Sequence, residues 1–485
     1  MFNVIIVGGI SYDKLGRPLG PFRLRTAVEN SGYTLKVIDY AWAFDESKML
    51  DLLSSLISVE TKVLGISASW FDRHHDNSAN SWATQSFFDK FKKMHPHVTV
   101  VTGGTKINIV PLLFNNSDWF ITGFSDIAFI QLLNYLFDKS VTLKYWKNDN
   151  VKVIQADTHY PVSNMDDLET VFKAEDNFLE YQPMPLEVSR GCIFKCAFCT
   201  HPFLGKKSYD YIRSSESLAK ELARNYELFG TYRYTISDDT FNDSYEKLDI
   251  VQRAIDIAKL PKFEFVGYIR PELLVTKVDM IDKLVSLGLK GAHLGIESMN
   301  DQARKAIGKG MDVNRVLEVV ERLRTCGVRL HSSFIVGLPY ELASEVYRTN
   351  DFLIANRHRY FHSWTFNGLG LAKSSSGESY SLFEKDPESY GIKTFEVPNE
   401  HWLNWTNNVG MTRKQANKIA ANCNAKSFEY MQFAGWSLAQ AWFHNITSDQ
   451  IINETIESTK INSLVKKNGN ERAELNYSQI VKSLT

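Results

Sequence analysis

The stretch Ser189-Arg-Gly-Cys-Ile-Phe-Lys-Cys-Ala-Phe-Cys-Thr-His201 decides how the rest of the chain is interpreted. It places Cys192, Cys196 and Cys199 on one short segment with the spacing C-x3-C-x2-C. Three thiolates in this arrangement can bind three irons of a [4Fe–4S] cube and leave the fourth iron open to a chelating molecule. A zinc site that includes His201 is one alternative, although structural zinc sites usually take ligands from two separated turns. Small buried hydrophobic cysteines are the other alternative.

The composition excludes several other classes of protein. The 485 residues are 44% hydrophobic and 23% charged, which is ordinary for a globular chain of two to four domains. A net charge of −1 disfavours a protein that coats nucleic acid. Five cysteines, three of them clustered, argue against a secreted disulfide framework. The start of the chain lacks a basic leader, and no apolar run approaches the ~18 residues that span a bilayer. We therefore expect a cytoplasmic protein without a membrane segment.

Residues 1–140 alternate strand-like and helix-like segments, as in an open parallel sheet. The expected strands are 2–7, 34–39, 62–69, 98–102 and 119–121. The expected helices are 21–31, 47–58, 87–94 and 127–137. This pattern predicts a doubly wound α/β domain of the Rossmann type, whose ligand would lie across the carboxyl ends of the strands.

A second alternating series follows a connector expected over residues 141–184. Its expected strands are 186–189, 232–237, 263–269, 292–297, 329–336 and 363–369. Its expected helices are 216–228, 247–259, 278–287, 313–324 and 341–356. Six units predict a partial (β/α)6 barrel over residues 185–385, with chemistry at the carboxyl ends of its strands. Residues 386–485 are expected to form a mostly helical C-terminal cap.

The cysteine motif resembles that of the radical S-adenosylmethionine (SAM) enzymes. Their hallmark is C-x3-C-x-aromatic-C in the loop after the first strand of a partial barrel, and Phe198 is the aromatic residue here. Further segments resemble the later motifs of this family and occur in the same order. They are SDDTF at 237–241, GYIR at 267–270, LGIES at 294–298 and FIVGLPYE at 334–341. The resemblance covers about residues 183–385.

This resemblance implies roles for individual residues. Cys192, Cys196 and Cys199 would hold the [4Fe–4S] cluster at which SAM is cleaved, and they are the expected catalytic residues. Asp238 or Asp239 would accept a hydrogen bond from the SAM ammonium, although such a pair is often only a helix N-cap. Further SAM contacts are expected on the other motifs, from Phe198, Arg270, Glu297, Ser298, Ile335 and Gly337, with Arg270 pairing with the SAM carboxylate.

Residues 1–140 resemble the cobalamin-binding domain that precedes the barrel in one large radical SAM subclass. The matching segments are 17–22, 64–69, 101–105 and 121–126. The cobalamin-binding residues implied by this resemblance are Leu19, Gly20, Ser67, Ser69, Gly103, Gly104 and Gly123. The D-x-H-x-x-G motif is absent, and residues 123–126 read Gly-Phe-Ser-Asp in place of Gly-x-Gly-Glu. These departures leave open a domain that keeps the fold without binding the corrin.

The leading hypothesis is cobalamin-dependent methyl transfer to an unactivated centre of an unknown substrate, following reductive cleavage of SAM to a 5′-deoxyadenosyl radical. The resemblance implies a small-molecule substrate and an external one-electron reductant such as flavodoxin or ferredoxin. Radical cyclisation or rearrangement with a vestigial cobalamin domain is the enzymatic alternative. A non-catalytic sensor that binds the cluster or cobalamin is another. RNA modification is disfavoured, because the basic residues of the C-terminal region are scattered and the net charge is near zero.

Overall fold

The chain forms two compact units, which are described separately: Met1–Asn177 and Phe178–Ile461. The computed structural model describes residues 1–8, 17–39, 41, 44–68, 82–104, 111–138, 141–156, 164–176, 178, 182–200, 212–371, 381–396, 402–432 and 434–443. Among these residues, no helix is both long and apolar enough to cross a membrane.

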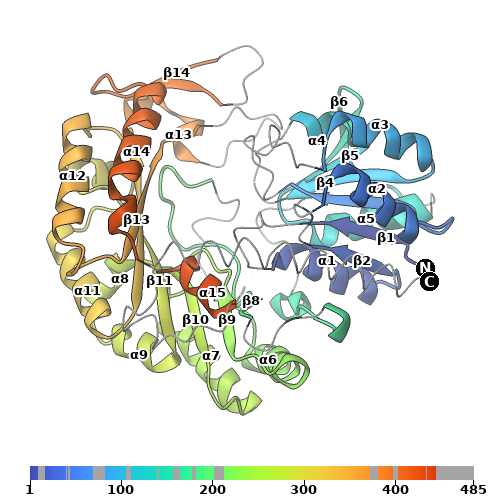
Figure 1. The fold of residues 1–485 in the computed structure, drawn as a ribbon, viewed down its shortest axis with the longest axis horizontal. Coiled ribbons are helices and arrows are strands. Elements are labelled where there is room, and N and C mark those ends of the chain that lie inside the picture. The colour runs from blue at the N-terminus through green and yellow to red at the C-terminus, as the bar shows by residue number, and fades with distance from the viewer. Residues whose placement is uncertain are drawn as a thin grey trace. The chain divides into compact units, whose positions relative to one another are not determined.

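The first unit is built on a seven-stranded sheet with the strand order β2-β1-β3-β4-β5-β7-β6 (Figure 1). The strands are β1 (Val4–Val7), β2 (Leu35–Ile38), β3 (Val63–Ser67), β4 (Thr99–Gly104), β5 (Trp119–Thr122), β6 (Trp146–Asn148) and β7 (Val151–Gln155). The helices are α1 (Leu19–Asn30), α2 (Glu46–Leu56), α3 (Gln85–Met94), α4 (Pro111–Asn115) and α5 (Asp126–Phe137). Helix α1 packs against α5 and α2 against α3, as expected for a doubly wound sheet with helices on both faces.

Helix α3 illustrates why these segments fold as predicted. Thr84 caps its first turn by accepting a hydrogen bond from the backbone N–H of Phe87. Phe87, Phe88 and Phe91 recur on one face of the helix and are fully buried in the core of this unit. An amphipathic helix of this kind is stabilised mainly by the apolar area that it removes from water.

The structure differs from the expected connector over residues 141–184. Strand β7 pairs in parallel with β5, and β6 pairs antiparallel with β7, so this segment extends the sheet of the first unit. Val151 and Val153 are buried against Phe114 and Phe120, which explains the pairing. The alternation of apolar and polar residues in Val151–Gln155 is a strand pattern that the prediction of a connector overlooked.

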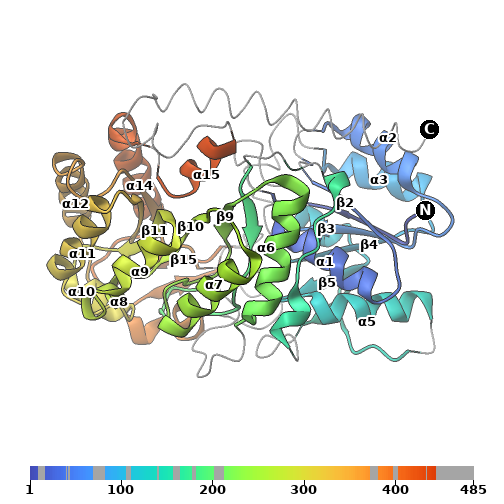
Figure 2. The same cartoon turned by 90° about the horizontal axis from the view of Figure 1, so that it is seen from below.

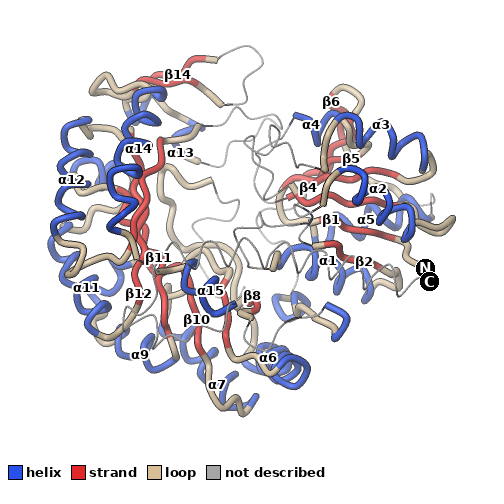
Figure 3. Tube along the Cα trace, in the orientation of Figure 1, coloured by secondary structure: helices blue, strands red, loops and turns tan. Residues whose placement is uncertain are grey.

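The second unit is a curved sheet of six parallel strands in sequential order, which confirms the predicted partial barrel (Figures 1 and 3). Its strands are β8 (Met184–Leu186), β9 (Arg233–Ile236), β10 (Glu264–Ile269), β11 (Leu289–Glu297), β12 (Arg329–Val336) and β13 (Ser363–Gly368). Its main helices are α6 (Ser215–Phe229), α7 (Tyr245–Ala258), α8 (Pro271–Thr276), α9 (Met280–Leu287), α10 (Asp301–Ala306), α11 (Val313–Thr325) and α12 (Ala343–Ala355). Figures 1 and 2 show α7, α9 and α11 along the outer side of this sheet.

The described part of the C-terminal region packs against the barrel, as expected for a cap. It contains α13 (Leu382–Lys385), α14 (Arg413–Ser427), α15 (Trp436–Phe443) and a small hairpin of β14 (Lys393–Phe395) and β15 (Asn404–Thr406). Asn424 of α14 accepts a hydrogen bond from the backbone N–H of Phe366 at 2.8 Å and donates one to its carbonyl at 2.8 Å. Helix α14 therefore covers the free edge of β13, which would otherwise present unpaired backbone groups.

The turn between α9 and β11 gives a test of the packing. Gly288 has a φ of 108°, and a Cβ atom there would lie 1.9 Å from the carbonyl oxygen of Phe263. We expect Gly288→Ala to lower the free energy of unfolding by about 3 kcal/mol, through backbone strain and the clash together. Gly327→Ala is the matched control, because Gly327 has a φ of 81° but no atom within 4 Å of the added Cβ. It should cost only about 1 kcal/mol. Equal losses in thermal or urea unfolding would contradict this account.

Candidate active site

The loop that carries the three cysteines is fixed by a buried carboxylate at the end of β9. Asp238 accepts hydrogen bonds from the backbone N–H groups of Val188 and Ser189, at 2.9 and 3.1 Å, and from the Ser189 hydroxyl at 2.6 Å. Its fourth partner is the Lys247 ammonium at 3.2 Å, which also pairs with Asp243 at 2.9 Å. Because Val188 and Ser189 donate to a side chain instead of a neighbouring strand, β8 ends at Leu186, earlier than expected.

Two of the three cysteines contact polar groups at the ends of neighbouring strands. The Cys192 sulfur lies 3.2 Å from the Thr240 hydroxyl after β9. Arg270, directly after β10, donates a hydrogen bond to the Cys196 sulfur at 3.1 Å. Burial raises the pKa of the Cys192 thiol, which is 8% exposed, and the hydrogen bond to Thr240 acts against this rise. Arg270 places a positively charged guanidinium beside the Cys196 sulfur.

Backbone hydrogen bonds hold the middle of the cysteine loop. The N–H of Ala197 donates to the carbonyl of Ile307 at 3.2 Å, and its own carbonyl accepts from the N–H of Phe383 at 3.0 Å. Phe194 lies under the Arg270 guanidinium, with 3.7 Å between the guanidinium carbon and the ring centroid. The loop is thereby fastened to segments that follow β10, β11 and β13.

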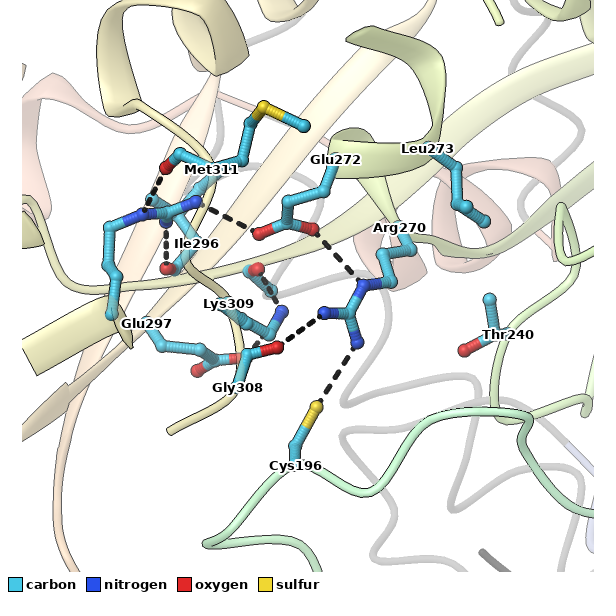
Figure 4. Close-up of polar contacts among 12 residues, drawn as sticks. Cys196, Thr240, Arg270, Glu272, Leu273, Ile296, Glu297, Gly308, Lys309 and Met311 are labelled. Atoms are coloured by element: carbon cyan, nitrogen blue, oxygen red, sulfur yellow. Dashed lines mark hydrogen bonds and ion pairs between the residues drawn. The ribbon is translucent and has the colours of Figure 1, made fainter. Parts of the chain in front are cut away.

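Figure 4 shows Arg270 at the centre of a charged network. Besides Cys196, its guanidinium contacts the carbonyl of Gly308 at 3.0 Å and the Glu272 carboxylate at 3.4 Å. Glu272 also accepts from Arg304 at 3.0 Å. Burial alone would raise the pKa of Glu272, but the charges of Lys309, Arg270 and Arg304 outweigh it and lower the pKa. The network holds the Arg270 side chain beside the cysteine loop.

The two aspartates predicted as alternatives differ in the structure. Asp238 is 1% exposed and is committed to the four donors described above, so it lacks a lone pair for a ligand. Asp239 is half-buried. Of the two, Asp239 is the one that could accept a hydrogen bond from SAM, and Asp238 is a positioning residue.

Glu297 and Ser298 end β11 beside the same network. Glu297 is buried, has a φ of 68°, which is uncommon for a residue other than glycine, and lies 3.6 Å from the Lys309 ammonium. Burial raises the pKa of Glu297, while Lys309 acts in the opposite direction. The Ser298 hydroxyl donates to the carboxylate of Glu341, which follows β12. Backbone strain of this kind is found often at functional sites.

The other residues predicted to contact SAM differ in their burial and packing. Phe198 is half-buried between Cys196 and Cys199, and Ile335 is a half-buried residue of β12. Gly337 is buried, and a Cβ atom there would lie 2.2 Å from the ring of Trp405. Close packing against Trp405 therefore accounts for the glycine at this position.

The donor set of the cysteine loop fits an iron–sulfur cluster in its chemistry. Three thiols on one short loop are the ligands that such a cluster takes. Within the described residues, which include all three cysteines, no group of three His, Cys, Asp or Glu side chains is arranged to hold a metal ion. The three sulfur atoms therefore lie on one loop but do not surround a common point in this structure. His201, the residue that a zinc site would add, lies outside the described residues.

In the first unit, the predicted cobalamin contacts lie at the carboxyl ends of the strands and the start of α1. Leu19 and Gly20 open α1, and a Cβ atom at Gly20 would meet nothing within 4 Å. Ser67 ends β3, Gly103 and Gly104 end β4, and Gly123 follows β5, whereas Ser69 lies outside the described residues. A Cβ atom at Gly103 would lie 2.9 Å from the carbonyl of Ile121, so sheet packing already requires that glycine. Small residues at these ends fit a large planar ligand that approaches the backbone closely.

Comparison with known proteins identifies the second unit. Residues 186–353 match the family model described as the radical SAM superfamily. Residues 186–353 are a radical SAM domain. The family uses SAM and a [4Fe–4S] cluster, and its matched segment contains Cys192, Cys196 and Cys199.

Individual relatives extend the similarity beyond that segment. The enzyme is 25% identical to an uncharacterized methyltransferase of Pyrococcus horikoshii over 70% of this chain and 73% of the relative. It is 25% identical to the bacteriochlorophyllide d C-12(1)-methyltransferase of Chlorobaculum tepidum, over 41% of this chain and 45% of that relative. In fold it is similar to the radical SAM methyltransferase TsrM of Kitasatospora setae, solved with cobalamin and a [4Fe–4S] cluster. That match has a TM-score of 0.66 at 13% identity and covers 97% of this chain and all of that one. The enzyme therefore shares the fold of this methyltransferase.

Four ionisable residues of the site were not singled out from the sequence. Lys309, Arg304 and Glu272 lie outside the quoted motifs, and Glu341 was quoted only as the end of one. Glu272 stands two residues after Arg270, and Lys309 lies between two glycines after a short helix. These positions were visible, but an ion pair across two loops has no sequence signature.

The role of Asp238 can be separated from that of Asp239 by substitution. We expect Asp238→Asn to lower the free energy of unfolding by about 3 kcal/mol, since it weakens the partner of the buried Lys247 and the anchor of the cysteine loop. Iron retained after anaerobic reconstitution should fall with it. Asp239→Asn is the matched variant, and we expect it to keep stability and iron while weakening SAM binding. Calorimetry with SAM and iron analysis measure both effects. A stable, iron-loaded Asp238→Asn enzyme would contradict the anchoring role.

The raised pKa of Glu341 should make the stability of the enzyme depend on pH. Burial raises its pKa to about 8 from the ordinary value of 4.5, with the Ser298 hydrogen bond acting against the rise. The folded state therefore prefers the protonated acid, and stability is lost as the pH rises from about 4.5 through 8. We expect Glu341→Gln to stabilise the enzyme by roughly 3 kcal/mol at pH 8.5 and to have little effect at pH 4.5. Thermal midpoints of both proteins across this range are the measurement. An equal difference at both pH values would refute the assignment.

Proposed function

We propose that the enzyme reductively cleaves SAM at a [4Fe–4S] cluster held by Cys192, Cys196 and Cys199 and, with cobalamin, transfers a methyl group to an unactivated centre of a small molecule. The observation that carries this proposal is the anchored cysteine loop, with Arg270 donating to the Cys196 sulfur at 3.1 Å inside the radical SAM domain. Methyl transfer is supported by relatives that are named methyltransferases and by a fold shared with a cobalamin-containing methyltransferase.

When bound, the cluster supplies the electron that breaks the sulfonium bond of SAM, and cobalamin supplies the chemistry of methyl transfer. The chain itself contributes placement and electrostatics. Asp238 and Lys247 fix the backbone on which the cysteines stand. Asp239 is proposed to accept a hydrogen bond from the SAM ammonium. Arg270, with its charge beside Cys196, is proposed to attract the SAM carboxylate, as expected from the family resemblance.

The first unit is proposed to bind cobalamin at the carboxyl ends of its strands. Leu19, Gly20, Ser67, Ser69, Gly103, Gly104 and Gly123 remain the proposed contacts. The proposed binding uses no protein histidine as a ligand to cobalt, because the D-x-H-x-x-G motif that supplies one in many cobalamin proteins is absent from the sequence. The electron is proposed to come from an external one-electron reductant such as flavodoxin or ferredoxin.

The decisive experiment measures what SAM becomes. Protein purified anaerobically and supplied with iron, sulfide and cobalamin should show a cluster shoulder and corrin bands in its absorption spectrum. After reduction, it should form 5′-deoxyadenosine and also S-adenosylhomocysteine, which remains when SAM donates its methyl group. Formation of 5′-deoxyadenosine alone would favour cyclisation or rearrangement over methyl transfer.

A matched pair of cysteine variants controls this experiment. Cys196→Ala should lose the cluster absorbance and at least about a thousandfold of SAM cleavage, because the cluster needs all three thiolates. Cys326→Ala should behave like the unchanged enzyme, since Cys326 is an exposed cysteine after α11. SAM cleavage that survives in Cys196→Ala would sink the proposal.

A further inference from the structure

The inner face of the barrel sheet carries a row of polar rings that the proposed reaction does not use. The strand register pairs Tyr268 of β10 with His293 of β11, His293 with His331 of β12, and His331 with Ser363 of β13. Residues in register on adjacent strands point to the same face of a sheet. The ring centroids of Tyr268 and His293 lie 4.9 Å apart, and those of His293 and His331 lie 4.5 Å apart. These four residues, here called the histidine row, form one continuous layer.

Hydroxyl groups connect the histidine row to the next layer toward the carboxyl ends. His331 has both ring nitrogens within hydrogen-bond distance of a hydroxyl, Ser363 at 2.8 Å and Thr365 at 3.3 Å. His293 uses Nε2 toward Ser333 at 2.8 Å. Its Nδ1 atom is buried and has no hydrogen-bond partner among the described residues. Leaving a buried polar atom without a partner is unfavourable, and a ligand that satisfied it would remove this cost.

The histidine row is closed on one side and continues toward the SAM residues on the other. Helix α15 packs at the amino end of the sheet, where Leu438 lies against Gly291 and Gly435 against His331. In the other direction, Arg270 follows Tyr268 by two residues, and Glu297 follows His293 by four. At about 3.3 Å per residue, the row lies roughly 7–13 Å along the strands from the site proposed to cleave SAM. Tyr268 is 38% exposed, so the row is accessible at that end.

The histidine row carries no charge near neutral pH. Burial lowers the pKa of His293 to about 4. Burial and the neighbouring His293 lower the pKa of His331 to about 3. The remaining members, Tyr268 and Ser363, carry neutral hydroxyl groups. A face of this kind can satisfy hydrogen bonds but cannot compensate the desolvation of an ion.

We propose that the histidine row binds a neutral, planar, hydrogen-bonding group of the substrate, through the unpartnered Nδ1 of His293 and the ring faces of Tyr268 and His293. This inference rests on the proposed function only for the statement that the ligand is the substrate. It makes the row a specificity determinant, because an analogue that lacks the hydrogen-bonding group leaves Nδ1 unsatisfied. An anionic or cationic group of the same shape is disfavoured.

The test uses the full chain and 2-pyridone as the probe, because this small planar molecule is neutral and both donates and accepts hydrogen bonds. Ligand-observed NMR titration should show binding to the unchanged protein and at least about tenfold weaker binding to His293→Phe, which keeps a ring but loses both nitrogens. His293→Asn restores a polar group near Nδ1 and should bind within about threefold of the unchanged protein. His358→Asn, an exposed histidine after α12, is the matched control and should bind normally. Benzoate, planar but anionic, should not compete.

Two results would overturn the proposal: 2-pyridone binding that is absent from the unchanged protein or undiminished in His293→Phe, and benzoate that binds as tightly as 2-pyridone. Thermal midpoints and reductive SAM cleavage are measured on the same samples. A single cooperative thermal transition in His293→Phe shows that the variant is folded. If the unchanged protein binds 2-pyridone but does not cleave SAM, the result counts against the proposed function alone. Intact cleavage without selective 2-pyridone binding would count against the histidine row alone.

Discussion

The ion pair between Lys247 and Asp238 is the interaction on which the catalytic end of the barrel depends. Both side chains are fully buried, so neither could stay charged without the other. Burial opposes the charge on Lys247, but Asp238 and Asp243 outweigh it and raise its pKa. Asp238, once held as a carboxylate, accepts three hydrogen bonds from Val188 and Ser189 and so sets where the cysteine loop begins. Helix α7, which carries Lys247, thereby helps to position the cysteine loop.

The fold was largely predictable from the sequence, because periodicity and turn residues report directly on strands and helices. Strand β12 has the bounds expected for it, and the other barrel strands differ by a few residues. The clear misses came from tertiary contacts. Strand β8 ends early because Asp238, fifty residues away, takes its backbone donors. Strands β6 and β7 were mistaken for a connector because their pairing with β5 is invisible in a local pattern.

The sequence was sufficient to predict the cysteine ligands of the candidate site, but not the residues that hold the cysteine loop in position. Cysteine spacing is a local property of the sequence. The order of the later motifs then indicated that the cysteine loop belongs to a partial barrel. The choice between Asp238 and Asp239 needed burial and hydrogen-bond partners, which one sequence does not contain. The ion pairs of Glu272 with Arg270 and Arg304 join the segments that follow β10 and β11, and the histidine row emerges only when the strand register is known. Features that depend on long-range pairing are those that sequence reasoning missed.

The edge of β13 matters for the association of this chain with other chains. An open sheet edge pairs readily with a strand of another chain. The Asn424 side chain occupies both backbone groups of Phe366, and a Cβ atom at Gly368 would lie 1.9 Å from Asn417 of the same helix. Helix α14 thus occupies the position that a strand of another chain would take, at the edge where the partial barrel remains open.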